Sequence, residues 1–374
     1  MRIGLITSSM DERRAGIGYY SYNLVKNLTK IDKKNDYVLI HHYPTNDEIY
    51  KENKELTIPY PRIPLRKTIG NNIILAWKLR SHDFDIVHDL SQISPFLFSS
   101  HFKKILTIHD LTPILFSETY GLIHVFLQKH VLPMTLKNID MIITVSEHSK
   151  QDIINHLKIP EEKIKVIYNG IDGRFKPLKK VDDVKEKYDI KSPFILYVGT
   201  LEPRKNIPTL INAFYELKKN GIGHKLVIVG GKGWKYKDIY EHVDKLNLQR
   251  EVIFTGYVSD DDLPKLYNAA DLFIYPSLYE GFGFPPLEAM ACGCPVITSN
   301  TSSLPEVVGD AGIMVDPYDV DEIANAMKRV LLDENLREEM IKKGLERAKK
   351  FSWENCAEET IRVYEFVGCG GRNL

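Results

Sequence analysis

The chain has 374 residues, too many for one ordinary hydrophobic core and about right for two domains. Lysine plus arginine and aspartate plus glutamate number 50 each, so no net positive charge favours a nucleic acid as partner. The four cysteines (Cys292, Cys294, Cys356 and Cys369) match no zinc-binding spacing and indicate no disulfide framework, which favours a reducing compartment.

The first residues, Met1-Arg-Ile-Gly-Leu-Ile-Thr7, predict a short strand, because their apolar run ends too early for a signal peptide. No later stretch approaches the ~20 apolar residues of a membrane span. We therefore expect a cytoplasmic protein, and peripheral contact with the inner face of the membrane stays open.

Short β-rich runs alternate with helical segments along the chain. Many runs are apolar at consecutive positions, which is typical of strands covered by helices on both faces. Between the first two runs, Gly16–Ile31 has apolar residues at spacings of three and four, which predicts a helix with one buried stripe. The predicted strands are Arg2–Thr7, Tyr37–His42, Ile86–Leu90, Lys104–His109, Met141–Val145, Lys165–Tyr168, Phe194–Gly199, Lys225–Val229, Val252–Gly256, Leu272–Tyr275, Pro295–Thr298 and Ile313–Val315.

This alternation predicts an α/β fold with two tandem, doubly wound parallel sheets. We expect the first domain over residues 1–175 and the second over 193–352, joined by a charged linker at 176–192. A last helix is expected at 353–367, and the first domain is the candidate surface on which it packs. Ligands of such sheets bind beyond the carboxyl ends of the strands, so those ends should line a cleft between the facing domains.

Two strand ends in the first domain carry candidate ligand-binding residues. The first strand leads to Gly16-Ile-Gly18 at a helix start, where glycine lets a ligand approach the backbone, although a simple turn explains this motif equally well. The fourth strand ends at His109, which would bond a sugar hydroxyl or shuttle a proton if it faces the cleft. Taken alone, His109 is better explained as a buried residue that bonds loop backbone.

In the second domain, the first strand ends at Gly199 and is followed by Arg204-Lys205 ahead of a helix. Arginine grips phosphate oxygens bidentately and lysine adds a point charge, so the pair is a candidate phosphate site, with a solvated turn as the alternative. Tyr257 and Val258 follow the third strand of this domain. They would contact a nucleobase, unless Tyr257 simply packs at the domain surface.

The most informative stretch is Glu280-Gly-Phe-Gly-Phe-Pro-Pro-Leu-Glu288, which follows an apolar strand. The order of strand, glycine loop and helix presents backbone N–H groups at a helix N-terminus, a natural seat for phosphate. Glu280 and Glu288 would flank the molecule to which that phosphate belongs. Two acidic clusters, Asp260–Asp262 and Asp83-Phe-Asp85, are better explained as a helix start and a solvated turn, so no metal is expected.

Together these motifs resemble the retaining glycosyltransferases of family 4, which have the two-domain GT-B fold. The resemblance covers nearly the whole chain, departs at no motif position, and looks most like the mannosyltransferase branch that builds surface polysaccharide. The motifs that carry it are Gly16-Ile-Gly18, His109-Asp110, Tyr168-Asn169-Gly170, Gly199-Thr-Leu-Glu-Pro-Arg204-Lys205-Asn206 and the E-x7-E pattern of Glu280 and Glu288.

The resemblance implies a hexose transfer from a nucleoside-diphosphate sugar to a hydroxyl of a glycan or lipid-linked acceptor. The branch alone favours mannose, from GDP-mannose. The first domain would bind the acceptor and the second the nucleotide sugar, with no cofactor and no metal. A sugar-nucleotide epimerase and a non-catalytic sugar-nucleotide-binding protein of the same fold are the alternatives, and the oligomeric state is open.

The resemblance also implies roles for single residues. Arg204 and Lys205 would bind the diphosphate, whose negative charge grows as the sugar leaves. Glu288 would bind the ribose hydroxyls, and Glu280 would face the sugar ring and stabilise its positive charge. His109 would contact the sugar near the reacting carbon. The remaining donor-site residues implied are Gly16, which would leave room for donor phosphate or acceptor, Gly281, Phe282 and Gly283, which would offer backbone, and Gly199, Tyr257 and Val258.

Retention of the anomeric configuration raises the question of mechanism. Retaining glycosidases use two carboxylates ~5 Å apart, but here ribose would occupy Glu288. A same-face attack by the acceptor hydroxyl is therefore favoured over a double displacement. The acceptor would bind within about residues 43–80, where Trp77 lies near Arg66-Lys67; a core-facing helix over Ile69–Leu79 is the favoured interpretation of that stretch.

Overall fold

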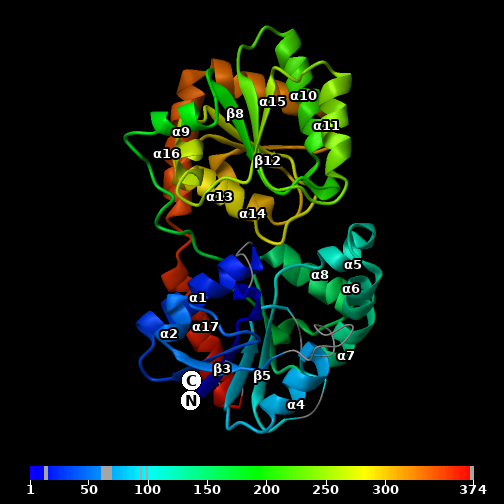
Figure 1. Ribbon diagram of the computed structural model, residues 1–374, viewed down its shortest axis with the longest axis vertical. Coiled ribbons are helices and arrows are strands. Elements are labelled where there is room, and N and C mark those ends of the chain that lie inside the picture. Colours follow the sequence, from blue (N-terminus) through cyan, green and yellow to red (C-terminus); the bar gives the residue numbers. More distant parts are fainter. Residues whose placement is uncertain (12–15, 60–69, 93–94, 98–99, 371–374) are drawn as a thin grey trace. The chain divides into compact units, whose positions relative to one another are not determined.

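The computed structural model describes residues 1–11, 16–59, 70–92, 95–97 and 100–370 (Figure 1). The chain forms two compact units: Met1–Gly170 with Ser352–Leu374, and Ile171–Phe351. Each unit is built on one parallel sheet covered by helices. The predicted α/β class with two Rossmann-like sheets is therefore confirmed. Within the described ranges, no helix combines the length and hydropathy needed to cross a bilayer.

The sheet of the first unit has seven strands in the order β3-β2-β1-β4-β5-β6-β7, all paired in parallel. For six of them, the predicted first and last residues lie within two positions of those observed. The seventh, β3, has the sequence Lys-Glu-Leu-Thr and lies half-exposed at the sheet edge, so it lacks the apolar run that marks the others. The strands are β1 Arg2–Ile6, β2 Asp36–His41, β3 Lys54–Thr57, β4 Ile86–Asp89, β5 Lys103–Ile108, β6 Met141–Thr144 and β7 Ile164–Val166.

Helices cover both faces of this sheet (Figure 1). Leu75 and Leu79 share one buried cluster with Leu132, Leu136 and Ile153, so their helices cover the same face. The helical segments are η1 Ser8–Met10, α1 Ile17–Ile31, α2 Glu48–Lys51, η2 Gly70–Leu75, α4 Ala76–Leu79, α5 Thr112–Leu115, η3 Ser117–Thr119, α6 Leu122–Phe126, η4 Leu127–Val131, α7 Leu132–Leu136, α8 Glu147–Leu157, η5 Glu161–Lys163 and α17 Trp353–Gly368.

The expected core-facing helix before β4 is only partly right. Leu75 and Leu79 are fully buried, but Trp77 between them is 68% exposed. Trp77 stands two positions from each of these leucines. On a helix, residues two positions apart point to different sides. Arg66 and Lys67 lie outside the described residues.

The last helix, α17, packs on α1 and belongs to the first unit. The Tyr364 hydroxyl is 2.7 Å from His88 Nδ1, and His88 Nε2 is 2.8 Å from Thr107 Oγ1. Burial lowers the pKa of His88 to about 3, so its ring is neutral. A neutral imidazole donates from one nitrogen and accepts at the other, so the ring bonds both hydroxyls at once. This network connects the end of the chain to β4 and β5.

The second unit has a six-stranded parallel sheet, in the order β10-β9-β8-β11-β12-β13. Residues 176–192, assigned to a linker from sequence, lie in this unit and contain the helix α9. The strands are β8 Phe194–Val198, β9 Lys225–Val229, β10 Val252–Gly256, β11 Leu272–Tyr275, β12 Val296–Ser299 and β13 Ile313–Val315. The helices are α9 Asp182–Lys187, η6 Pro203–Lys205, α10 Ile207–Lys219, α11 Tyr236–Lys245, α12 Leu263–Ala269, α13 Phe284–Ala291, α14 Leu304–Val308, η7 Gly309–Ala311, α15 Val320–Leu332 and α16 Glu334–Ala348.

Candidate active site

The carboxyl ends of β8 and β11 lie side by side, because these strands pair in the second sheet. After β8 the chain makes the short turn η6, which ends at Asn206 in the left-handed conformation (φ 57°) and begins α10. The loop after β11 is joined to this turn, since Leu278 N donates to Arg204 O at 2.9 Å. Two loops that are far apart in sequence are thereby fixed against each other.

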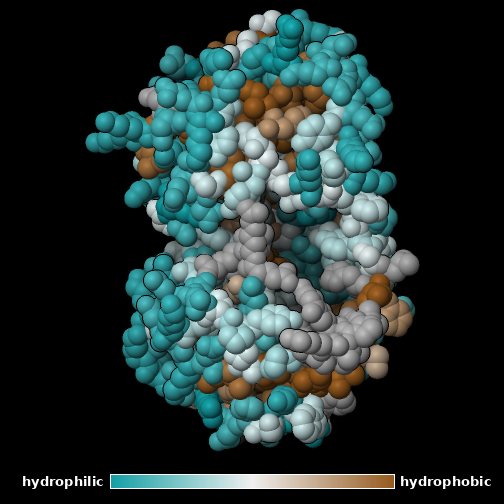
Figure 2. All heavy atoms as spheres, in the orientation of Figure 1, coloured by the Kyte–Doolittle hydropathy of each residue, from teal (hydrophilic) through white to brown (hydrophobic). Residues whose placement is uncertain are grey.

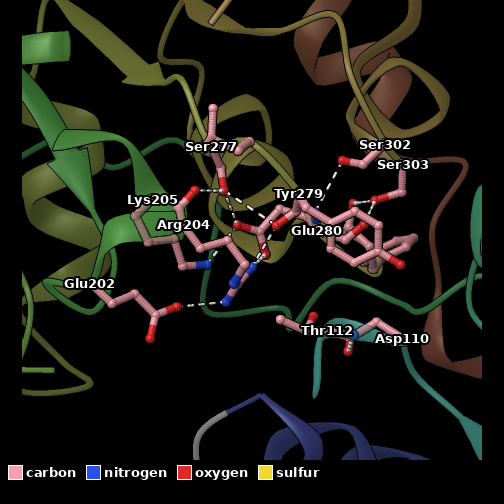
Figure 3. Close-up of polar contacts among 12 residues, drawn as sticks. Asp110, Thr112, Glu202, Arg204, Lys205, Ser277, Tyr279, Glu280, Ser302 and Ser303 are labelled. Carbon is pink, nitrogen blue, oxygen red and sulfur yellow. Dashed lines mark hydrogen bonds and ion pairs between the residues drawn. The ribbon is translucent and has the colours of Figure 1, made fainter. Parts of the chain in front are cut away.

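Arg204, Lys205 and Glu280 form a nearly buried ion cluster at this place (Figure 3). Glu280 Oε1 accepts from Lys205 Nζ at 2.6 Å, and Glu280 Oε2 lies 3.2 Å from Arg204 Nη1. Oε1 also accepts from the hydroxyls of Tyr275 at 2.9 Å and Ser277 at 2.6 Å. Both carboxylate oxygens are therefore engaged within the protein.

The two cations have further partners. Arg204 donates from Nη1 to the Tyr279 carbonyl at 2.5 Å and from Nη2 to Glu202 Oε1 at 2.7 Å. Lys205 Nζ donates to the Tyr275 hydroxyl at 2.8 Å. Among these four charged residues, Glu202 has the most exposed side chain, at 26%. Two positive and two negative side chains thus balance each other, and Glu202 is the one that a ligand can most easily displace.

The electrostatics of the cluster favour an ionised Glu280. Burial alone would raise the pKa of this carboxyl, but the charges of Lys205 and Arg204 and the hydrogen bonds outweigh burial and lower it to about 2. Burial lowers the pKa of Lys205, and the adjacent Glu280 opposes that shift. The carboxylate stays charged because protonating it would leave the two buried cations without a counter-ion, and an unpaired buried charge costs several kcal/mol.

Glu288 has a separate environment on α13. Its Oε2 accepts from the Tyr267 hydroxyl of α12 at 2.8 Å, and its side chain is nearly buried. Burial raises the pKa of Glu288 to about 7, against the lowering effects of the Tyr267 hydrogen bond and the Arg174 charge. Glu280 and Glu288 therefore have opposite pKa shifts and different hydrogen-bond partners, so the two carboxyls lie in separate environments.

The loop between the two glutamates is held by serines that follow β12. Ser302 Oγ accepts from the Glu280 N–H at 3.0 Å, and Ser303 Oγ donates to the carbonyls of Glu280 at 2.9 Å and Phe282 at 2.7 Å. Gly283 has a φ of 113° directly before α13, a conformation that favours glycine. Pro285 and Pro286 carry no N–H, so the first turn of α13 offers fewer phosphate donors than an ordinary helix start.

Three other residues predicted for the donor site, Gly199, Tyr257 and Val258, also belong to the second unit. A side chain on Gly199 would meet the Tyr197 hydroxyl at 2.7 Å, so packing is a sufficient reason for glycine there. Tyr257 is 56% exposed, with its hydroxyl 3.3 Å from Asp260 Oδ1. Val258 is buried and can offer only backbone to a ligand. Among the described residues, no group of three or more histidine, cysteine or acidic side chains is arranged to hold a metal.

His109 and Gly16 belong to the first unit. His109 follows β5 and is nearly buried, with Nε2 3.0 Å from the Leu90 carbonyl. A carbonyl only accepts, so Nε2 carries the proton; burial lowers the pKa of the ring, which leaves Nδ1 as an acceptor. The expectation that a buried His109 bonds loop backbone is therefore correct for its Nε2 atom. Gly16 begins α1 with a φ of 44°, and a Cβ placed there would meet no atom of the described residues within 4 Å.

Sequence reasoning missed several hydrogen-bond partners of the cluster, of Glu288 and of the loop between the two glutamates. The missed partners are Glu202, Tyr267, Tyr275, Ser277, Ser302 and Ser303. Tyr275 and Ser277 stand within five residues of Glu280, so the end of β11 could have indicated them. Ser302 and Ser303 could have been found only from the pairing of β11 with β12.

Comparisons with known proteins agree with this architecture. The family described as "Glycosyltransferase Family 4" matches residues 14–174, and "Glycosyl transferases group 1" matches residues 179–347. The O-antigen chain mannosyltransferase B of Escherichia coli is 34% identical over 98% of this chain and 100% of its own. Sucrose-phosphate synthase from Thermosynechococcus elongatus has the same fold, with a TM-score of 0.81, 23% identity and 99% coverage of both chains. Anabaena HepE, solved with UDP-glucose, matches with a TM-score of 0.79, 18% identity and coverage of 98% and 99%.

Proposed function

Because the chain belongs to the group 1 glycosyl transferases of family 4, with the GT-B fold, we propose that it moves a hexose from a nucleoside-diphosphate sugar to a hydroxyl of a glycan or lipid-linked acceptor. The Arg204–Lys205–Glu280 cluster carries the proposal, since it combines two cations with a buried carboxylate beside a glycine loop. Similarity to an O-antigen mannosyltransferase along the full chain supports mannose as the sugar and GDP-mannose as the donor. The UDP-glucose complex of HepE supports the donor class.

In the proposed donor complex, Arg204 and Lys205 stabilise the departing diphosphate. The breaking bond joins the anomeric carbon to a phosphate oxygen, so negative charge grows on the diphosphate and fixed cations lower the barrier. The hydrogen bonds to Glu280, Tyr275 and Tyr279 keep both cations oriented before the donor arrives. Backbone of Gly281, Phe282 and Gly283 completes the phosphate and sugar contacts.

The rest of the donor has separate partners in this proposal. Glu288 accepts hydrogen bonds from the two ribose hydroxyls, while Tyr257 and the backbone of Val258 contact the base. Glu280 lies near the sugar ring, and Gly16 leaves room for donor phosphate or acceptor. His109 accepts a hydrogen bond from a sugar hydroxyl through Nδ1, the nitrogen that its bond to Leu90 leaves unprotonated.

We propose that the configuration is retained by same-face attack, without a metal. Glu280 is a poor nucleophile because both its oxygens accept bonds from Lys205, Arg204, Tyr275 and Ser277. The two cations supply the positive charge that a metal would otherwise bring to the diphosphate. A covalent sugar adduct on Glu280, trapped with a slow donor analogue, would overturn the same-face mechanism.

One assay tests the function itself. GDP-mannose and other nucleotide sugars are first screened by thermal shift, and transfer of labelled sugar to lipid-linked and glycan acceptors is then measured. We expect binding of one donor and sugar transfer that needs an acceptor. An isomerised sugar in the absence of acceptor would identify an epimerase, and tight binding with no turnover on any acceptor would identify a sugar-nucleotide sensor.

A surface of the first unit suits a lipid-linked acceptor. Outward-facing apolar side chains stand on η2 and α4 and on the segment from α6 to α7, and Figure 2 shows apolar atoms at the right-hand edge, where Figure 1 places α6. Residues 70–82 and 120–139 contain four lysines or arginines and no acidic residue. Apolar and basic side chains together favour an anionic lipid surface. The apolar members are Ile73, Trp77, Ile123, Phe126 and Met134.

Vesicle binding tests this surface. The double variant Trp77→Ser/Phe126→Ser should bind vesicles with anionic lipid several-fold more weakly than the unchanged protein, because it removes two aromatic side chains from the contact. Trp234→Ser is the matched control, since Trp234 is similarly exposed but belongs to the second unit. Equal vesicle binding by the double variant and the control would remove the membrane proposal and leave the transferase proposal intact.

A further inference from the structure

A hydrogen bond between Tyr267 and Glu288 connects two neighbouring helices of the second unit. Tyr267 lies on α12 and Glu288 on α13, and these helices contact each other. The Tyr267 hydroxyl donates to Glu288 Oε2 at 2.8 Å. Among the described residues, Glu288 is the only hydrogen-bond partner of this hydroxyl. Because the tyrosine is fully buried, its hydroxyl depends on the carboxylate for that bond.

The ring of Tyr267 is fixed by other aromatic rings. It meets Phe175 edge to face, with 5.9 Å between the centroids, and Phe273 of β11 in the same manner at 5.5 Å. Edge-to-face contacts of this kind are favourable and have a specific geometry. The hydroxyl of Tyr267 therefore has a defined position, and so does the Glu288 oxygen that accepts from it.

The two oxygens of Glu288 differ in what they bond. Oε2 is held by Tyr267, whereas Oε1 has no hydrogen-bond partner among the described residues and is open to solvent. A carboxylate has about four acceptor positions, and Tyr267 uses one of them. Two hydroxyls need two positions, which Oε1 provides by itself. The open side of Glu288 therefore suits a pair of neighbouring hydroxyls.

We propose that Tyr267 is a positioning residue for the donor: by holding Glu288 Oε2 it keeps Oε1 open to the two ribose hydroxyls, and so makes the enzyme distinguish a ribonucleotide sugar from its deoxyribose analogue. The inference rests on the proposed function, in which Glu288 binds the ribose. Tyr267 is buried and contacts no substrate in this scheme. Its effect on donor binding passes through Glu288.

The charge of Glu288 depends on the same hydrogen bond. Burial raises the pKa of Glu288 to about 7, and the bond from Tyr267 is the strongest effect that opposes this rise. The tyrosine stays a neutral donor, because burial raises its own pKa well above the usual value. Loss of the hydroxyl should therefore raise the pKa of Glu288 further, so that the ionised acceptor forms only at higher pH. The other titratable groups that face Glu288 are Arg174, which lowers its pKa, Asp172 and Asp260, which raise it, and the buried Cys292.

The first experiment removes hydroxyls from both the protein and the ligand. Isothermal titration calorimetry at pH 8 compares GDP-mannose with its 2′-deoxyribose and 3′-deoxyribose analogues. Wild type should bind each analogue about tenfold more weakly, since each lacks one hydrogen bond to a charged group. Tyr267→Phe keeps the ring between Phe175 and Phe273 and loses only the hydroxyl. It should bind GDP-mannose about fivefold more weakly and distinguish the analogues by less than about threefold.

The matched control is Tyr364→Phe. This change also removes a buried tyrosine hydroxyl that makes a short hydrogen bond, at 2.7 Å to His88, but it lies in the first unit. It should keep the wild-type discrimination against both analogues. The comparison separates a general effect of losing a buried hydroxyl from an effect at the ribose.

The second experiment measures transfer against donor concentration and pH. A ribose contact is made equally in the ground state and the transition state, so Tyr267→Phe should raise KM for GDP-mannose about fivefold with kcat close to wild type. The fall of KM with rising pH should occur at higher pH than in wild type. A loss of folded protein would lower the apparent kcat instead and leave KM and its pH profile unchanged.

The outcomes separate this inference from the proposed function. Full discrimination against the analogues by a folded Tyr267→Phe protein would refute the positioning role. If that variant does not fold, 3-fluorotyrosine at position 267 replaces it; its more acidic hydroxyl donates more strongly, so donor binding should improve at lower pH than in wild type, and an unchanged profile would count against the proposal. A wild type that binds neither GDP-mannose nor any other nucleotide sugar would overturn the proposed function and this role with it.

Discussion

Lys205 Nζ and Glu280 Oε1 lie 2.6 Å apart, and both side chains are about one-tenth exposed. Each residue is therefore the other's counter-ion before any substrate is present. The family resemblance assigned Glu280 to the sugar ring and Lys205 to the diphosphate, as if they acted separately. Their contact makes them one unit, so a change at either residue should alter both the stability of the second unit and its binding of anions.

Lys205→Met should be far more damaging than the loss of one surface charge. It leaves Glu280 as a buried carboxylate with only Arg204 as cationic partner, and breaking a buried pair costs about 3–5 kcal/mol of unfolding free energy. Transfer activity should fall by at least 100-fold, since a charge that stabilises the leaving group is lost. Urea unfolding and a transfer assay measure the two effects.

The matched control for this change is Lys219→Met, which breaks the exposed pair of Lys219 with Glu216 and should barely change the stability. The double change Lys205→Met/Glu280→Gln should recover much of the stability without recovering activity. Equal stability losses for the variants at Lys205 and Lys219 would show that the buried ion pair does not stabilise the fold.

Glu202→Gln should strengthen the binding of nucleoside diphosphates. Glu202 occupies Arg204 Nη2 at 2.7 Å, so it competes with a phosphate for the same donor. Removing a partly exposed ion pair of about 1 kcal/mol should lower Kd by about fivefold. Isothermal titration calorimetry with GDP measures the change, and Glu216→Gln is the control. A weaker affinity in Glu202→Gln would mean that Glu202 orients Arg204 instead of competing for it.

Binding of GDP-mannose should improve between pH 6 and 8. The pKa of Glu288 is raised to about 7, so the carboxyl is mostly protonated at pH 6 and mostly ionised at pH 8. Only the ionised form accepts two hydroxyl donors, so affinity should rise about tenfold over this range. The donor is preferable to GDP here because its phosphates do not titrate in this range. Glu288→Gln should bind weakly with a flat pH profile; a wild-type profile in this variant would contradict the assignment to ribose.

Tyr364→Phe should destabilise the first unit. The change removes the hydroxyl that is hydrogen-bonded to the buried His88 Nδ1, and a buried polar group left without its partner costs about 1–3 kcal/mol. Urea unfolding measures the loss, and Tyr318→Phe is the control because Tyr318 is 72% exposed. If both variants unfold at the same urea concentration, the His88 network contributes no stability.

Much of the fold could be predicted because buried parallel strands have a strong sequence signal. Leu226-Val-Ile-Val229 and Leu272-Phe-Ile-Tyr275 are apolar throughout, and both lie where the sequence placed them. β3 could not be predicted, because an exposed edge strand needs no apolar run. The exposure of Trp77 was also missed, since an apolar residue in a helical stretch usually faces the core.

The site was harder to predict than the fold. Arg204, Lys205 and Glu280 could be expected near one another, because residues at the carboxyl ends of strands meet at one sheet edge. Sequence could not tell which oxygen pairs with which nitrogen, nor that Glu202 competes for Arg204. Those contacts depend on side-chain directions within two loops. The roles assigned to His109, Gly16 and Glu288 in catalysis and binding stay predictions.

The return of α17 to the first unit has a consequence for synthesis. The first unit lacks this helix until residues after Phe351 are made, whereas Ile171–Phe351 is one uninterrupted stretch. During translation the second unit is therefore complete while the first still exposes the surface of α1 that α17 covers. The half of the protein that is begun first therefore receives its last helix only after the whole of the second unit has been made.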